Sequence, residues 1–272
     1  NFVGNGRKPY YMLNLLSKQS IPEGGEDGSA GFLFFETADG YQFKSIDKLF
    51  DKPQKKSYIF NNSTDSQVTP PGYDGKILEQ QSDSSVNVQS KMNIGAYKTK
   101  LVLFDPFNCE YVVEEKTADE AVQKNKVKLA GKKLPKFNNK FDTPNKDFTR
   151  TTFMLIDSGT LPAGSTDEQI KENQRDNFKA AQTLNQAIRR YNQLFSGMME
   201  ITIAGDFSLH AGDVIFVDIP AIDSEKSDTL NRESGGLYII ADLCHFVNAD
   251  GTYTKLNLAR DSFGRKGNHS KR

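Results

Sequence analysis

The chain has 272 residues, which suits one large domain or two smaller ones, so its length excludes neither arrangement. Its 35 Lys plus Arg residues balance 35 Asp plus Glu residues, which is typical of neither a nucleic-acid-binding protein nor an acidic coat. No apolar run approaches the ~20 residues needed to cross a bilayer, and no signal-like segment opens the chain. We therefore expect a soluble protein that is not exported and makes no membrane contact.

The first predicted element is a short helix that begins at Pro9, a residue suited to the first helical position. The stripe from Tyr11 to Leu16 is apolar at helical spacing, so this helix has to bury one side. The next segment, "GFLFFETADGYQFKSIDKLF" (residues 31–50), predicts a β-hairpin turned at Asp39-Gly40, because Asp-Gly accepts the positive φ angles of a two-residue turn.

Both faces of this predicted hairpin are apolar. With Ala38 opposite Tyr41, one face carries Phe32, Phe34, Tyr41 and Phe43, and the other carries Leu33, Phe35 and Ile46. A hairpin with two apolar faces cannot leave one of them in water, so we expect the preceding helix to cover one face. We expect the other face to pack on a returning segment of the chain or on a neighbouring subunit. The candidate subunit-contact residues are Phe32, Phe34, Phe35, Tyr41 and Phe43.

The middle of the chain contains prolines and short strand patterns. Residues 51–72 are polar and contain three prolines, with only "SYIF" (57–60) resembling a strand, which predicts a domain boundary. Three strand-like pieces follow, "GKILEQQS", "YKTKLVLFDP" and "NCEYVVEE", of which the last two predict a second hairpin. Residues 116–150 lack periodicity before "RTTFMLID" (150–157) predicts another strand.

The last part of the chain predicts one long helix and then four strands. Ser165 and Glu168 have capping-box spacing, and apolar residues recur at helical spacing as far as Phe195. The strands that follow, within 199–260, suggest a small barrel or curled sheet. We interpret the residues at its turns, and at the first hairpin turn, as structural rather than ligand-binding. These structural turn residues are Asp39, Gly40, Gly205, Gly212 and Gly251.

A search for catalytic or metal-binding motifs finds none, so we predict no catalytic, cofactor-binding or metal site. His210 and Asp213 could pair as a base and a carboxylate, but Gly212-Asp213 is also a natural turn before a strand, and we favour the turn. Cys244 and His245, like Glu114 and Glu115, are adjacent strand residues that point to opposite faces. We interpret Cys244 and Cys109 as small buried residues in strands.

Lysines without intervening acids make 124–140 the strongest local charge signal in the chain. Aromatic and glycine residues are sparse there, so we favour a solvated or subunit-contacting loop and leave open a weak polyanion contact. The residues of that possible contact are Lys124, Lys126, Lys128, Lys132, Lys133 and Lys136. The basic tail at 263–272 is interpreted as a disordered end.

The order of these elements resembles the baseplate hub protein of contractile-tailed bacteriophages, the T-even-type hub that is related to the hubs of tail-like injection machines. The resemblance covers residues 5–260 and is strongest at Gly95-Ala96-Tyr97 and at the pattern of Gly205, Gly212 and Pro220. It also follows "FLFFETADGYQF", "NIGAYKTKLVLFDPFNCEYVVEE" and "ITIAGDFSLHAGDVIFVDIP". The first tube-like domain of that family would lie upstream of Asn1, so we expect a longer polypeptide.

The resemblance implies a homotrimeric, non-enzymatic virion protein without a cofactor. It would join the tail tube, or a tube-adaptor protein, to the central spike, in a ring through which DNA passes. Its location would be the tail baseplate, after assembly in the host cytoplasm.

The implied fold is α+β and mainly β, with a small tube-like β-barrel domain, a long flanking helix and a smaller α+β domain. The barrel would comprise 73–115 and 166–262, and the smaller helix-hairpin domain would comprise 1–62 completed by 116–165. Two alternatives from other classes remain at this point. One is a virion-associated hydrolase and the other is a carbohydrate-binding module of a tail, although the chain has no Trp.

Overall fold

The structure is a computed structural model. It describes residues 6–22, 31–60, 75–82, 88–105, 110–117, 128–131, 150–155, 165, 167–168, 180–219, 234–249 and 251–264. Within these ranges, no helix combines the length and the apolar character that crossing a membrane requires. Strands dominate the described elements, so the prediction of an α+β, mainly β fold is confirmed.

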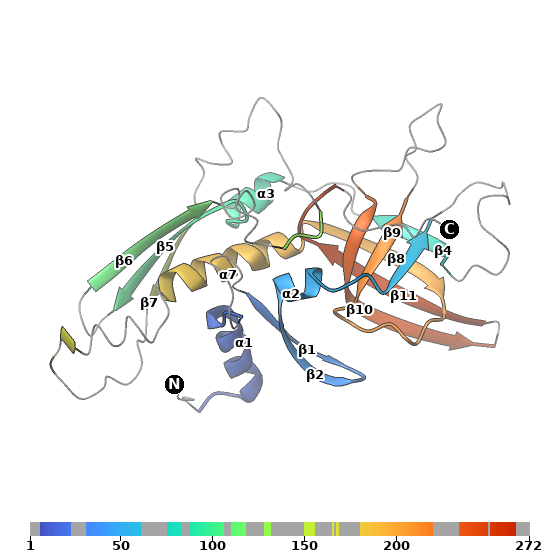
Figure 1. Ribbon diagram of the computed structural model, residues 1–272, viewed down its shortest axis with the longest axis horizontal. Helices are drawn as coiled ribbons and strands as arrows, with labels where there is room; N and C mark the ends of the chain where they lie inside the picture. Colours follow the sequence, from blue (N-terminus) through green and yellow to red (C-terminus); the bar gives the residue numbers. More distant parts are fainter. Residues whose placement is uncertain are drawn as a thin grey trace, which may run out of the picture.

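The larger of the main sheets has six strands in the order β3-β9-β10-β11-β8-β4. They are β3 (Lys56–Ile59), β4 (Ile77–Ser82), β8 (Gly197–Ala204), β9 (Val214–Asp218), β10 (Gly236–Asn248) and β11 (Gly251–Arg260). Strand β3 runs parallel to β9, and the other neighbours are antiparallel. The four C-terminal strands form the curled sheet that their sequence predicts (Figure 1).

The two edge strands of this sheet meet at one point. Ile59, the last residue of β3, forms a parallel bridge with Lys76, just before β4. The backbone N–H of Ile59 donates to the carbonyl of Gly75 at 2.8 Å. Among the described residues this bridge is the whole of the β-pairing between β3 and β4. The sheet therefore curls until its first and last strands touch end to start.

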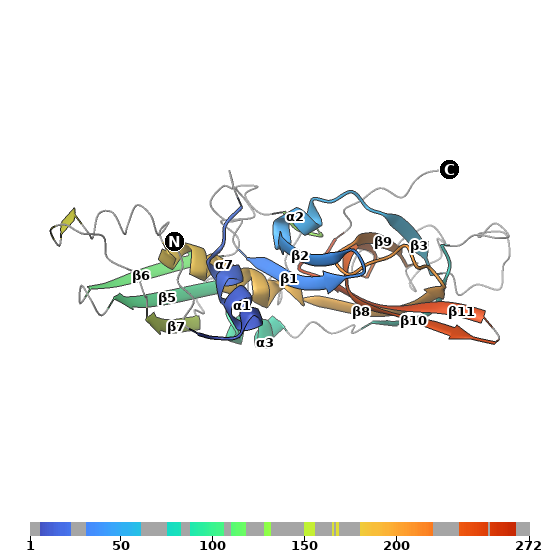
Figure 2. The same ribbon diagram turned by 90° about the horizontal axis from the view of Figure 1, so that it is seen from below.

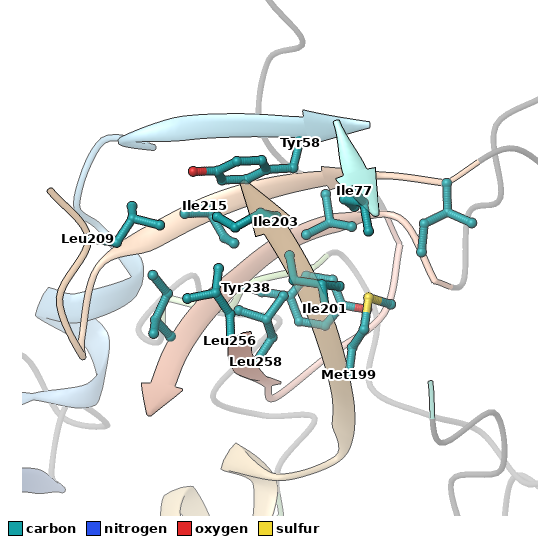
Figure 3. Close-up of a cluster of buried hydrophobic side chains, with 13 residues drawn as sticks. Tyr58, Ile77, Met199, Ile201, Ile203, Leu209, Ile215, Tyr238, Leu256 and Leu258 are labelled. Atoms are coloured by element: carbon teal, nitrogen blue, oxygen red, sulfur yellow. The ribbon is translucent and has the colours of Figure 1, made fainter. Parts of the chain in front are cut away.

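The concave side of the six-stranded sheet holds the main core (Figure 3). Alternate residues of β8, Met199, Ile201 and Ile203, point inward and are buried, as are Leu256 and Leu258 of β11. This period of two is the pattern expected for a strand with one buried face. Each fully buried aliphatic side chain contributes about 1.5–3 kcal/mol relative to an exposed one, so this cluster accounts for much of the folding free energy.

The second sheet has three strands in the order β6-β5-β7. Strands β5 (Lys98–Asp105) and β6 (Glu110–Thr117) pair as the predicted antiparallel hairpin. Strand β7 (Arg150–Leu155) runs parallel to β5 on its other side.

This distribution of strands corrects the predicted domains. Strand β3 belongs to the six-stranded sheet rather than to a separate unit of residues 1–62. Strands β5 and β6 pair with β7, and not with the strands of 166–262. The reason is that partners far apart in sequence are selected by tertiary packing: Tyr58 of β3 is buried in the main core, which local sequence pattern does not reveal.

Helix α7 (Ala180–Leu194) runs between the two sheets (Figure 1). It contacts β5 and β6 at one side and β11 at the other. Buried polar side chains fix it to the three-stranded sheet and to the segment just before it: Arg189 donates to the carbonyl of Thr117 in β6 at 3.0 Å, and Gln193 donates to the carbonyl of Ala96, two residues before β5, at 2.7 Å. The short helix α3 (Val88–Asn93) precedes this sheet. Helix α7 thus ties together two sheets that share no strand.

The N-terminal elements lie against the middle of the molecule (Figures 1 and 2). They are α1 (Pro9–Gln19), β1 (Phe32–Thr37), β2 (Gly40–Ser45) and α2 (Ile46–Phe50). Pro9 occupies the start of α1 as predicted, and the Ser45 hydroxyl caps α2 by accepting from the N–H of Lys48 at 3.2 Å.

The register of the first hairpin corrects the predicted one. Thr37 pairs with Gly40 and Glu36 with Tyr41, so the two-residue turn is Ala38-Asp39 and not Asp39-Gly40. Gly40, with φ +109°, follows the turn instead of forming it. A positive φ at the glycine just after the turn closes such a hairpin, so Asp-Gly marks the end of the turn here.

Candidate subunit-contact surface

The outward face of the first hairpin carries a ladder of aromatic rings. Phe34 and Tyr41 stack with centroids 5.7 Å apart, and Phe32 and Phe43 stack at 4.9 Å. Tyr10 of α1 meets the edge of Phe34 at 5.5 Å. We call these five residues the aromatic face. Tyr41 is 64% exposed and Tyr10 is 57% exposed, so α1 covers this surface only in part.

Hydrogen bonding and charge connect the polar ends of this surface. A side-chain hydrogen bond with Tyr41 is the largest of the effects that raise the pKa of Tyr10, and the charge of Glu36 has a smaller effect in the same direction. Glu36 lies directly opposite Tyr41 in the hairpin register, so its carboxylate borders the rings. The aromatic face therefore combines apolar rings with one acidic group, a composition suited to protein contact.

Phe35, which we predicted among the contact residues, lies on the opposite face. It packs with Ile46 and Leu49 in a second buried cluster, together with residues of α7 and β9. A Cβ built on Gly212 would meet the Phe35 ring at 2.6 Å, which shows how closely the two approach. Successive strand residues alternate between faces, so Phe35 cannot share a surface with Phe34. Its role is to attach the hairpin to the six-stranded sheet.

Tyr191 of α7 holds the hairpin and α1 in place. Its hydroxyl donates to the carbonyl of Phe32 and accepts from the N–H of Phe32 at 3.1 Å. Ser17 of α1 lies 3.3 Å from the same hydroxyl. Burial raises the pKa of Tyr191, so it stays protonated and can donate. The aromatic face is therefore positioned by the same helix that joins the two sheets.

A buried ion cluster centres on Arg190 of α7. Its guanidinium donates to Asp261 at 2.7 Å and to Asp47 of α2 at 2.8 Å, and also to the carbonyl of Lys128 at 3.1 Å. Arg190 is 1% exposed. Burial by itself lowers the pKa of Arg190, but the two carboxylates outweigh burial and raise it, so the group is cationic. The cluster joins four segments that are remote in sequence.

The two carboxylates of this cluster are not equivalent. Asp261 also accepts from the N–H of Ala130 at 3.0 Å and from the Ser262 hydroxyl at 2.8 Å. One oxygen of Asp47, Oδ2, is buried without a hydrogen-bond partner among the described residues. Burial accordingly raises the pKa of Asp47 although Arg190 opposes the shift. Asp261 is the stronger anchor.

The described part of the lysine-rich segment is residues 128–131. Ala130 is buried, and the N–H of Gly131 donates to the Ser262 hydroxyl at 2.7 Å, so this part is fixed to the end of β11. Lys128 points outward and lies 3.4 Å from Asp51. The other lysines of the possible polyanion contact lie outside the described residues, so the prediction for them stays untested. Those lysines are Lys124, Lys126, Lys132, Lys133 and Lys136.

The residues considered for catalysis have structural partners. Asp213 accepts from Lys55 at 2.7 Å and from the N–H of His210 at 3.0 Å, in a turn before β9. His245 lies 2.9 Å from the Thr254 hydroxyl. Cys244 is exposed, which corrects its predicted burial: it lies on the outer side of β10, and Cys109 is outside the described residues. Among the described residues, no group of three or more His, Cys, Asp and Glu side chains could hold a metal ion.

One cavity of about 560 Å³ lies beside β4 and β8, lined by Phe60, Leu78, Glu79 and Glu200 among others. Its carboxylates are spread along the outer side of the sheet, and Glu200 pairs with Lys255 at 2.8 Å. Lys76 and Thr202 also line this cavity, and the described residues show no hydrogen bond that links either of them to Glu79 or Glu200.

The turn positions require glycine for different local reasons. Gly212 has φ +79°, and Gly40 has φ +109°, both in the region that glycine favours. Gly205 has another constraint, because a Cβ there would meet Cγ2 of Thr252 at 2.4 Å. Gly251 begins β11 immediately after the loop from β10.

No protein-family model matches the chain. Over 269 residues it is 20% identical to the "Probable baseplate hub protein gp334" of Vibrio phage KVP40, a match that covers 96% of this chain and 59% of that protein. The resemblance to baseplate hub proteins is thereby confirmed. The chain spans less than two thirds of the length of this relative.

Two solved structures of tail proteins are also similar. The tail protein from Neisseria meningitidis MC58 has a TM-score of 0.48 at 13% identity, over 95% of this chain and 56% of that one. The 43 kDa tail protein of prophage MuSo2 from Shewanella oneidensis has a TM-score of 0.41 at 11% identity, over 95% of this chain and 54% of that one. At these scores the two likenesses do not establish a shared fold.

Proposed function

We propose that the chain is a structural subunit of a phage tail baseplate hub. The observation that carries this proposal is the similarity to a baseplate hub protein over 96% of the chain. In this role the protein is a component of the virion baseplate and is assembled in the host cytoplasm.

The working form is a ring-like homotrimer that joins the tail tube, or its adaptor, to the central spike and lets DNA pass. We propose the six-stranded sheet, which curls until β3 and β4 touch, as the tube-like barrel in the wall of such a ring. The aromatic face supplies an apolar surface that the described residues of one chain leave partly exposed. Both features favour assembly over a free monomer.

The hub does its work without catalysis. Asp206 and Asp213, two acidic side chains near the histidines, are engaged by Lys56 and Lys55 in turns that hold β3 and β9. His245 contacts Thr254 and the ring of Phe207. These contacts give the residues a structural role in their turns.

The test is the stoichiometry of the full-length protein, by light scattering in solution and by imaging of particles that carry a label on this chain. Three copies at the junction of tube and spike are expected. A stable monomer or two-fold dimer in both settings contradicts the hub. Peptidoglycan cleavage by the purified chain contradicts the non-enzymatic part of the proposal.

A further inference from the structure

The three-stranded sheet has a second face that helix α7 does not cover. Thr99 and Leu101 of β5 are buried toward α7, so the alternate residues of β5 point away from it. The register places Val102 beside Val113 and Phe153, and Phe104 beside Tyr111, on that opposite face. We call these five residues the outer sheet face.

The outer sheet face is strongly exposed. Phe153 is 76% exposed and Tyr111 is 70% exposed, and Phe104 and Val113 are exposed as well. A sheet face with four large exposed apolar side chains is unusual for a surface that remains in water. It lies on a different sheet from the aromatic face.

The charges beside the two surfaces are opposite in sign. Lys98, Lys100 and Glu115 continue the outer sheet face by register. Glu115 pairs with Lys98 at 2.9 Å, and the ion pairs of the described residues do not include Lys100. The aromatic face is bordered by Glu36, which likewise has no ion pair in the described part of the chain.

We propose that the outer sheet face of one copy binds the aromatic face of the next copy, with Lys100 placed to meet Glu36. Two different apolar surfaces on one chain, with opposite marginal charges, make a head-to-tail contact, which closes into a ring when the rotation allows. This inference rests on the proposed function for the size of the ring, but it names a contact that is tested separately.

Cross-linking between two single-cysteine variants tests the contact. In a background with Cys109→Ser and Cys244→Ser, Tyr41→Cys and Phe153→Cys are prepared separately and then mixed with a short bismaleimide. Cross-linked dimers in the mixture, with few from either variant alone, are the expected result. Dimers from each variant alone indicate a two-fold contact between like surfaces and overturn the proposal. A chain that yields no dimers up to its highest soluble concentration overturns it too.

Charge reversal gives an independent readout. Glu36→Lys and Lys100→Glu, each alone, should weaken self-association at least about tenfold by sedimentation equilibrium, because each places like charges together. The double variant should recover most of the loss. A matched control, Glu79→Lys on the exposed part of β4, should leave association unchanged. Equal loss in the single and double variants contradicts the pairing. If the protein is found in the baseplate but the two cysteine variants do not cross-link to each other, only this contact is overturned. If the protein is absent from the particle, the proposed function is overturned.

Discussion

Arg190 and Asp261 form a fully buried ion pair, with 2.7 Å between the guanidinium Nη1 and the carboxylate Oδ2. The pair connects the helix between the two sheets to the residue that follows β11. A buried pair of this kind contributes more to the geometry of the fold than to its stability, but loss of one partner is costly because the remaining charge is left uncompensated.

The two acids around Arg190 should differ in their effect on stability. Asp261→Asn is expected to lower the free energy of unfolding by about 3 kcal/mol, since Asp261 accepts hydrogen bonds from three groups and neutralises Arg190. Asp47→Asn should cost about 1 kcal/mol, because one Asp47 oxygen has no hydrogen-bond partner among the described residues and burial disfavours its charge. Urea denaturation measures both variants, and equal costs would contradict the ranking.

Gly212 should tolerate alanine less well than Gly40. Both have positive φ, which costs about 1 kcal/mol for alanine, but a Cβ at Gly212 would also meet Phe35 at 2.6 Å, whereas nothing lies within 4 Å at Gly40. Gly212→Ala should therefore lower the free energy of unfolding by about 2–3 kcal/mol and Gly40→Ala by about 1 kcal/mol. Thermal unfolding of the two variants measures the difference, and an unchanged melting temperature for Gly212→Ala would contradict it.

The turn at Asp206 should make stability depend on acid pH. Burial works against ionisation, but hydrogen bonds from Lys56, Ser208 and Tyr58 outweigh it and lower the pKa of Asp206 to about 2. Because the folded pKa lies below the unfolded value, this stabilisation is complete above pH ~4 and is lost as the pH falls toward 2.

Solvent screening limits the contribution of Asp206 to about 1 kcal/mol. The difference in unfolding free energy between the wild type and Asp206→Asn should therefore be constant from pH 7 to about 5 and shrink below pH ~4. Denaturant titrations across this range measure it. A difference that does not change with pH would assign the role of Asp206 to turn geometry alone.

Tyr191→Phe should loosen the N-terminal hairpin more than the core. The variant loses the hydroxyl that joins both backbone groups of Phe32 and reaches Ser17, so a loss of about 1–2 kcal/mol is expected. Amide exchange should rise in β1, while β8 and β11 remain protected. Tyr238→Phe, which loses a hydrogen bond to the Ser234 carbonyl at 2.7 Å, is the control in the six-stranded sheet. Equal exchange in β1 for both variants would contradict the assignment.

The lysine-rich segment should bind duplex DNA weakly and without sequence preference. Charges without stacking partners give only the electrostatic component of affinity, which falls steeply with salt. Fluorescence anisotropy at increasing salt tests this expectation, and a variant with Lys132→Gln and Lys133→Gln serves as the comparison. Submicromolar binding that survives ~0.3 M salt would contradict it.

Local pattern predicted several elements well and their partners less well. The two faces of the first hairpin were predictable, because alternation places Phe34 and Phe43 together in either register. The turn itself was displaced, since Asp-Gly occurs both within turns and at their ends. Cys244 was expected inside because free cysteine is usually buried, but β10 extends beyond the core there.

The contacts that join segments remote in sequence could not be predicted from the sequence. Arg190 and Gln193 have the appearance of solvent-facing helix residues, yet both are buried because partners arrive from other segments of the chain. The parallel pairing of β3 with β9 depends on a core that forms only once the whole sheet has curled. The burial of Ala130 inside a lysine-rich segment has no periodic signal at all.

The bridge between Ile59 and Lys76 sets how the curled sheet can deform. Five strand-to-strand ladders hold the sheet, and in the described part of the chain a single backbone bridge spans its remaining gap. Under a radial load, that bridge is the weakest point in the circumference, and its opening leaves the ladders intact. We therefore expect the sheet to widen by opening at this bridge and to close again, while the paired strands keep their register.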